Sequence, residues 1–346
     1  MLDKIKPGSK VIKKFKIAEN ADRSPLKLPL IIIKGREDGP VLLLNAAVHG
    51  NELIGVEIIR RLMKKLGPKD IKGTLIGVPI VNIPAYNISQ RMDPLDKKDM
   101  NREFPGDPAG SITQRLAHFF YTEIVELADY IIDFHSAEYP DVMLPHIRVR
   151  TKDSTGKSLL LSRAYSTEIV WEGEEINGML QVCAVKAGKA AITVEIGAAS
   201  ALEEEEVEAG IKGIKNVMTV LGMLEGTADI LDYQVYIKST EQWKRSPHGG
   251  IFRPFVKLGD IVKKGQALGE IADPFNLKVD QIKAESSGLV AGVKISPVVR
   301  TGTRLFFLLP PREVKNWIEE IKLVKVPELP NSRHVENQLL QKVKRQ

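Results

Sequence analysis

Residues 41–53, with the sequence VLLLNAAVHGNEL, join a buried strand to a helix and carry two polar side chains at the junction. The first four residues are apolar without alternation, which is typical of a strand covered on both faces of a parallel sheet. From Ile54 onward apolar residues recur at helical spacing, until a Gly-Pro pair stops the predicted helix. We therefore expect His49 and Glu52 at the carboxyl end of a strand and in the first turn of a helix, where open α/β sheets bind ligands.

The pair His49 and Glu52 supplies two of the side-chain types that bind zinc, and a catalytic zinc takes three protein ligands and keeps one open position. A second predicted strand, residues 130–134, leads directly into His135. A lone histidine at such a place is more often a hydrogen-bonded core residue, but two of them beside a glutamate form a three-ligand set. The sequence predicts one Zn²⁺ per chain at these three residues, with Asp133 as a core residue or a hydrogen-bond partner of a ligand.

Two further stretches place polar groups near the predicted zinc. The apolar run 190–196, AAITVEI, carries Glu195, and a carboxylate there is costly without a partner. It is either a structural acid paired with a buried donor or the general base of a metal site. Residues 87–110 form a long polar stretch without periodicity, and such loops are usually functional or disordered. In it, Asn101 and Arg102 make a planar donor pair that can clamp a carboxylate, unless the stretch is simply a solvated surface loop.

Length and composition limit the classes of protein to which this chain can belong. At 346 residues the chain accommodates one large domain and a smaller one. The net charge is +6, but the basic residues are spread among 44 acidic ones, so we expect small anionic substrates rather than nucleic acid. Cys183 is the single cysteine, which excludes an internal disulfide framework. No apolar run approaches the ~20 residues of a membrane span, and the first ten residues lack the apolar core of a signal peptide, so we expect no membrane association and a cytoplasmic protein.

The motifs HGNE, MNREFPG, DFHS and TVEIG, in this order, resemble those of the succinylglutamate desuccinylase/aspartoacylase family, within the wider group of zinc carboxypeptidase-like enzymes. The resemblance covers roughly residues 40–310. It implies an α/β fold with a mostly parallel mixed sheet flanked by helices, and zinc at the three predicted ligands. It also implies that Glu195 is the proton shuttle, that Arg91 polarises the scissile carbonyl and stabilises its oxyanion, and that Asn101 and Arg102 hold the carboxylate of the substrate.

A second, all-β domain is predicted after a linker at residues 226–228. Residues 252–271 and 282–295 resemble the two halves of a lipoyl/biotinyl-like barrel-sandwich. In the deacylase family such a barrel packs over the catalytic domain and can narrow its entrance. Lys278 lies near the place of the modified lysine in carrier domains, but its neighbours do not reproduce that motif, and we expect His248 to occupy a turn. The predicted division is a catalytic domain at 1–228, a barrel at 229–310 and a C-terminal extension at 311–346.

These features predict a zinc-dependent amidohydrolase that removes the acyl group from a small N-acyl amino acid or related amine. A metallocarboxypeptidase acting on peptides is the alternative, because it shares the whole zinc constellation. A non-catalytic metal-binding or carrier protein requires Glu195 or Arg91 to lie out of reach of the metal. Whether the chain forms a homo-oligomer is left open.

Overall fold

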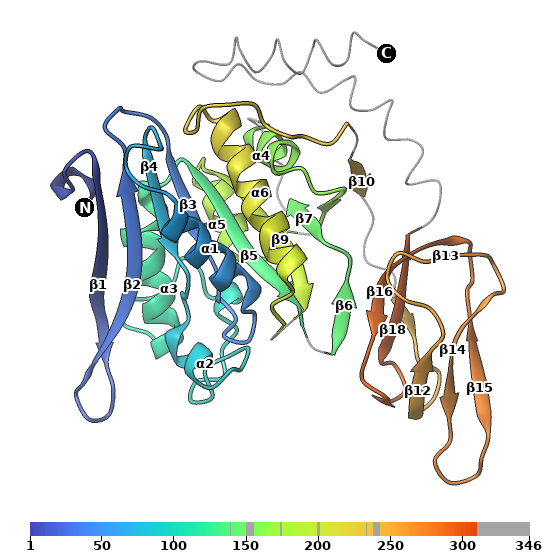
Figure 1. The fold of residues 1–346 in the computed structure, drawn as a ribbon. Helices are drawn as coiled ribbons and strands as arrows, with labels where there is room; N and C mark the ends of the chain where they lie inside the picture. Colours follow the sequence, from blue (N-terminus) through green and yellow to red (C-terminus); the bar gives the residue numbers. More distant parts are fainter. Residues whose placement is uncertain are drawn as a thin grey trace.

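A nine-stranded mixed sheet forms the centre of the molecule, with the strand order β1-β2-β4-β3-β5-β9-β7-β8-β10 (Figure 1). The computed structural model describes residues 1–138, 140–149, 156–173, 175–198, 201–232, 234–237 and 243–309. The strands of this sheet are β1 (Ser9–Glu19), β2 (Pro25–Lys34), β3 (Val41–Asn45), β4 (Thr74–Val78), β5 (Tyr130–Ala137), β7 (His146–Val149), β8 (Ile169–Glu172), β9 (Ala190–Ala198) and β10 (Val235–Ile237). Strands β4, β3, β5 and β9 run parallel to one another, whereas β1, β2 and β7 pair antiparallel with a neighbour. The predicted mixed α/β sheet is confirmed.

Helices cover both faces of the sheet, and the apolar strand β3 shows why. Its side chains alternate between the two faces, so that Leu42 and Leu44 enter one buried cluster and Leu43 enters the other, each fully buried. The first face carries α1 (Ile54–Lys65), α4 (Lys157–Tyr165) and α6 (Glu204–Val220), and the second carries α3 (Ile112–Glu123) and α5 (Leu180–Lys186). Shorter helices are α2 (Ile83–Asn87), η1 (Leu2–Lys4), η2 (Met100–Arg102) and η3 (Val125–Leu127). None of the helices in the described residues has the length and apolar content to cross a membrane.

Residues 243–309 consist of strands and connections, without a helix. One sheet has the order β11-β18-β16-β13, and another has the order β15-β14-β12-β17. These strands are β11 (Trp243–Arg245), β12 (Gly250–Pro254), β13 (Ile261–Val262), β14 (Ala267–Ala272), β15 (Val279–Lys283), β16 (Gly288–Lys294), β17 (Val298–Val299) and β18 (Arg304–Leu309). The two sheets enclose a core of their own around Phe252, Leu268 and Phe306.

The two parts of the chain share strands. Strand β6 (Asp141–Met143), which follows β5, pairs with β16 in the C-terminal part. Strand β10 lies beyond residue 228 and yet pairs with β8 in the large sheet. The domain boundary at residues 228 and 229 therefore stays a prediction, and residues 311–346 lie outside the described residues. His248 is exposed in the connection between β11 and β12, where a turn was expected.

Candidate active site

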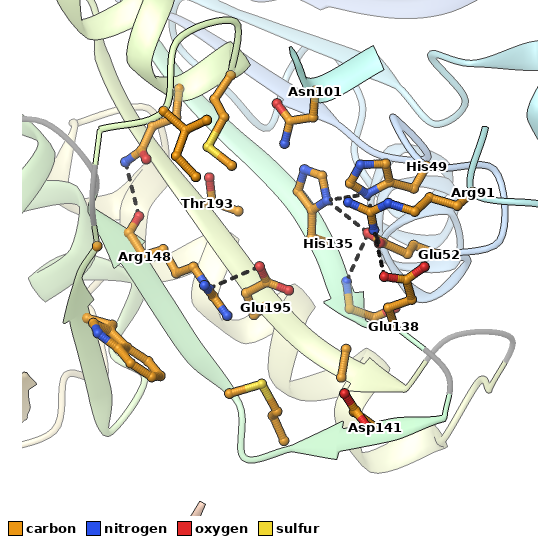
Figure 2. Close-up of a pocket in the computed structure, with 18 of the residues that line it drawn as sticks. His49, Glu52, Arg91, Asn101, His135, Glu138, Asp141, Arg148, Thr193 and Glu195 are labelled. Carbon is orange, nitrogen blue, oxygen red and sulfur yellow. Dashed lines mark hydrogen bonds and ion pairs between the residues drawn. The ribbon is translucent and has the colours of Figure 1, made fainter. Parts of the chain in front are cut away.

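His49, Glu52 and His135 meet where β3 and β5 end (Figure 2). Both imidazoles turn Nδ1 toward the same carboxylate: His49 Nδ1 lies 2.7 Å from Glu52 Oε1, and His135 Nδ1 lies 2.8 Å from Oε2. The three residues are 3%, 3% and 4% exposed. We call these three side chains the metal-ligand cluster.

The position of Glu52 differs from the expectation. Helix α1 begins at Ile54 with Leu53 as its N-cap, so Glu52 precedes the helix instead of lying in its first turn. The reason is a tight turn in which the Glu52 N–H donates to the carbonyl of His49 at 3.1 Å. This turn places the imidazole and the carboxylate side by side.

The metal-ligand cluster fits a zinc ion. Ligand atoms of a tetrahedral zinc with bonds of about 2.0–2.1 Å lie about 3.3 Å apart. The two Nδ1 atoms are 3.2 Å apart, close to that spacing. The contacts of Glu52 are shorter, so its carboxylate would move back by about 0.5 Å to reach the same separation.

The outer nitrogens of both imidazoles meet carboxylates. His49 Nε2 lies 3.0 Å from Asp99 Oδ1, and His135 Nε2 lies 3.0 Å from Asp133 Oδ2. Asp133 also accepts a hydrogen bond from Asn45 at 2.6 Å. Such partners orient metal-binding imidazoles and select the tautomer that leaves the inner nitrogen free. Asp99 was not predicted as a site residue, although its place two residues before the Asn-Arg pair was a usable signal.

The electrostatics of the metal-ligand cluster favour positive charge. Burial by itself raises the pKa of Glu52, but the two imidazoles outweigh it and hold that pKa well below its usual value. Burial likewise lowers the pKa of His49, yet Glu52 and Asp99 outweigh it and the pKa is raised. The pKa of His135 is raised in the same way, against burial, by Asp133 and Glu52. Buried carboxylates around two imidazoles make this a site that attracts a cation.

Arg91 lies against the metal-ligand cluster. Its Nη1 is 3.3 Å from Glu52 Oε1, and its Nη2 donates to Asp99 Oδ2 at 3.0 Å. Glu138 is a third acidic neighbour, 3.6 Å from Nη1. Burial lowers the pKa of Arg91, but these carboxylates outweigh it and raise the pKa, so the guanidinium stays charged beside the cluster.

Asn101 and Arg102 lie on η2 and line the same cleft as the metal-ligand cluster. The Oδ1 atom of Asn101 accepts from the Leu180 N–H at 2.9 Å, which leaves the amide nitrogen to point into the cleft (Figure 2). The backbone N–H of Asn101 donates to Asp99 Oδ1 at 2.9 Å. Arg102 uses one nitrogen on the carbonyl of Asn101 at 2.8 Å. The predicted donor pair is thus held by its own loop and by α5.

Glu195 lies on β9, directly opposite His135 on β5. Its carboxylate meets the Arg148 guanidinium at 3.2 Å, and both side chains line the cleft (Figure 2). Arg148 comes from β7, the antiparallel neighbour of β9, and was not predicted. Glu195 has a charged partner and also lines the cleft of the metal-ligand cluster, so the two alternatives raised from sequence both stay predictions.

The cleft has a volume of about 850 Å³ and is built from both parts of the chain. Trp243 and Arg304 of the C-terminal strands line it together with Asp141 and Met143 of β6. The C-terminal part therefore forms one wall of the candidate active site.

The catalytic-domain model of the succinylglutamate desuccinylase/aspartoacylase family matches residues 38–221, more than half of the chain. The chain belongs to the succinylglutamate desuccinylase/aspartoacylase family. Enzymes with these names hydrolyse the amide bond between an acyl group and an amine, so this family member is an amide-cleaving hydrolase.

Relatives of this family member extend the likeness beyond the catalytic domain. N-alpha-acetyl-L-2,4-diaminobutyric acid deacetylase from Halomonas elongata is 27% identical over 285 residues, which cover 80% of this chain and 83% of the relative. An aspartoacylase family protein from Mesorhizobium loti has a TM-score of 0.75 at 27% identity, over 88% of this chain and 95% of that one. The product-bound ectoine utilization protein EutE (DoeB) from Ruegeria pomeroyi shares the fold with a TM-score of 0.78 at 24% identity, over 86% and 94% of the two chains.

Proposed function

We propose that this family member is a zinc-dependent deacylase that hydrolyses a small N-acyl amino acid or related amine. The observation that carries the proposal is the metal-ligand cluster, in which two imidazoles and a carboxylate converge within one buried site. Arg91 and Glu195 lie beside it in the same cleft. The relative from Halomonas elongata, named as a deacetylase of an N-acetylated amino acid, supports the same class of substrate.

The side chains of the cleft divide the chemistry among them. A zinc ion held by His49, Glu52 and His135 would lower the pKa of a bound water far below that of free water, to about 7, and so supply a nucleophile at neutral pH. Glu195 would accept a proton from the attacking water as the oxygen of that water bonds to the acyl carbon. The same carboxyl group then donates that proton to the amine nitrogen as the carbon–nitrogen bond breaks.

Three donors handle the charges of the substrate. Arg91, a fixed cation at the edge of the metal-ligand cluster, offsets the negative charge that develops on the carbonyl oxygen. Asn101 and Arg102 bind the carboxylate of the amino acid, because both side chains line the cleft and carry N–H donors suited to a carboxylate. Orientation by these groups holds the amide near the reacting atoms.

A metallocarboxypeptidase acting on peptides is the second candidate, and the size of the cleft favours keeping it. A volume of about 850 Å³ exceeds what a single N-acetylated amino acid occupies. Both reactions use the same side chains, so only the substrate separates them.

A panel of N-acetyl, N-succinyl and longer N-acyl amino acids, assayed beside dipeptides with zinc-loaded enzyme, tests the proposal. We expect hydrolysis of N-acyl amino acids with kcat/KM well above that of any dipeptide. The reverse preference would replace the deacylase with the peptidase.

The metal is tested separately by its stoichiometry. We expect one zinc per chain by elemental analysis, and loss of stoichiometric zinc in His49→Ala and in His135→Ala while the far-UV circular dichroism is retained. Full zinc occupancy in either folded variant would refute this ligand set.

A further inference from the structure

The cleft extends far beyond the metal-ligand cluster, across four adjacent strands. On its floor His135 of β5 lies opposite Glu195 of β9. Farther along, Arg148 of β7 lies between Thr193 of β9 on one side and Trp171 of β8 on the other. Neighbouring strands are about 4.8 Å apart, so Trp171 is about 14 Å from His135 along the floor.

A small N-acyl amino acid does not span this length. An acetyl group joined to one amino acid is about as long as two residues of extended chain, roughly 7 Å. About 7 Å of the floor therefore stays unused when such a substrate reacts at the metal-ligand cluster, which is room for roughly five carbons.

Apolar side chains line the cleft around Trp171 and Trp243, beside the guanidinium groups of Arg148 and Arg304. We call this part of the cleft the far arm and define it by the lining residues Met143, Ile176, Trp171 and Trp243. Both tryptophans pack on Phe307, with ring centroids 5.0 Å and 5.9 Å away. They are 3% and 9% exposed, so they are held in place and present only a small part of each ring.

Two guanidinium groups cover further ring surface in the far arm. Arg148 lies over Trp171 at 5.4 Å from the ring centroid, and Arg304 lies over Trp243 at 5.7 Å. Arg148 is already paired with Glu195. The side chains of Met143 and Ile176 and the ring edges are then the surfaces that an entering group would touch, and they suit an alkyl chain.

We propose that the far arm is a subsite for an apolar chain of about five carbons attached to the N-acyl amino acid core. The inference rests on the proposed deacylase function and names the class of its substrate more closely. The chain belongs either to the acyl group or to the side chain of the amino acid, and substrates lengthened in one or the other part distinguish these two sources.

Two series of substrates test the subsite and identify the source of the chain. One series lengthens the acyl group from acetyl through butanoyl and hexanoyl to octanoyl on alanine, and the other lengthens the side chain of N-acetyl amino acids. We expect kcat/KM to rise about fourfold per methylene in one series until the far arm is filled. Flat or falling values in both series would overturn the proposal. A preference for an N-adipoyl over an N-hexanoyl substrate would also overturn it. In that case Arg304 would recognise the terminal carboxylate of the substrate, and the apolar surface would not recognise its chain.

Variants of Met143 locate the effect in the far arm. Met143→Ala removes apolar contact and Met143→Trp fills the space, and each should reduce the ratio of kcat/KM between the longest and the acetyl substrate by at least tenfold. Ile261→Ala is the matched control, since Ile261 lies on the C-terminal strand β13 and is 83% exposed. Unchanged ratios in both Met143 variants would refute the subsite.

A binding measurement separates this inference from the proposed function. If no compound of either series is hydrolysed, the deacylase proposal fails. Calorimetry with the same compounds still measures whether they bind in the far arm. Affinity that rises with chain length and is lost in Met143→Trp supports the subsite, and affinity independent of chain length removes it.

Discussion

At the scale of single residues, Asp99 joins three parts of the site. Its carboxylate meets the outer nitrogen of His49, the Arg91 guanidinium and the backbone N–H of Asn101. One side chain therefore contacts a predicted metal ligand, the proposed oxyanion arginine and the loop proposed to bind the substrate carboxylate. Glu195 has a simpler environment, with Arg148 as its partner across the strand pair β7 and β9.

Replacing Glu195 by Gln tests its role as the proton shuttle. Glutamine keeps the shape but cannot accept the proton of the attacking water, so we expect kcat to fall by roughly 10²–10⁴ with zinc content unchanged. Steady-state kinetics and elemental analysis measure the two quantities. Glu168→Gln, at an exposed glutamate, is the control. Near-normal turnover in Glu195→Gln would remove this residue from the mechanism.

Replacing Asp99 by Asn tests the outer support of His49. The amide lacks the negative charge that orients the imidazole, so we expect zinc affinity to fall by about 10–100-fold, as when other such partners of metal ligands are changed. Competition with a fluorescent chelator measures the affinity. Asp107→Asn, an exposed residue of the same stretch, should bind zinc like the parent protein. Equal affinities in all three proteins would show that Asp99 does not support the metal.

At the scale of elements, the polar stretch before α3 is anchored to that helix. Asp96 accepts hydrogen bonds from the Ser111 hydroxyl at 2.7 Å and from the Thr113 N–H at 3.0 Å. The helix also begins with a capping box, in which Gln114 accepts from the Ser111 N–H at 3.0 Å. These contacts hold the end of the loop that carries Arg91 and Asn101, so the start of the helix helps to position the site.

Asp96 gives this anchor a pH dependence. Burial raises the pKa of Asp96, but the hydrogen bonds from Ser111 and Thr113 outweigh it and the pKa is lowered. A carboxyl whose pKa is lower in the folded than in the unfolded protein stabilises the folded state. This stabilisation is complete above the unfolded pKa of about 3.9, and it is lost as the pH falls through the lower pKa of the folded state.

We expect Asp96→Asn to lower the free energy of unfolding by about 1 kcal/mol at pH 7, the usual effect of weakening a helix cap. The difference from the parent protein should shrink as the pH is lowered below about 4. Urea unfolding at pH 7, 5 and 3.5 measures it. A difference that grows toward low pH would contradict the assignment.

At the scale of the whole molecule, an aromatic cluster and a shared strand connect the two parts of the chain. Phe307 of β18 stacks on Trp171 of the large sheet with the ring planes 16° apart, and it also contacts Trp243. Strand β6 pairs with β16 a short distance along the chain from His135. Because Trp171 and Trp243 line the cleft, the shape of that wall depends on the contact between the two parts.

Phe307→Ala is expected to weaken both parts together. Loss of this 3% exposed ring should cost about 3–5 kcal/mol, and unfolding should remain a single transition in which circular dichroism and tryptophan fluorescence coincide. Phe275→Ala, at a ring that is 93% exposed, should leave stability unchanged. Two separate transitions in the parent protein would show that the parts unfold independently.

Local features of this protein could be read from its sequence because they depend on neighbouring residues. The apolar run of β3, the helical spacing of α1 and the capping box of α3 all follow from side chains a few positions apart. The motif around His49 and Glu52 is equally local, since one turn joins them. Helix α5 was not predicted, although its Leu180 N–H holds Asn101. Its sequence is too short to show the helical spacing of apolar residues, and the helix depends on its packing against the sheet.

By itself the sequence determined the alternation of strands and helices and the residue types that meet at the strand ends, because polarity and spacing encode both locally. The tertiary structure alone decided that β9 lies between β5 and β7, which brings Glu195 beside His135 on one side and Arg148 on the other. It also decided that Asp99 lies within hydrogen-bond distance of His49, and that Trp243 and Arg304 line the cleft. These contacts join residues far apart in the chain, and their formation depends on how the whole core packs, which no short stretch of sequence specifies.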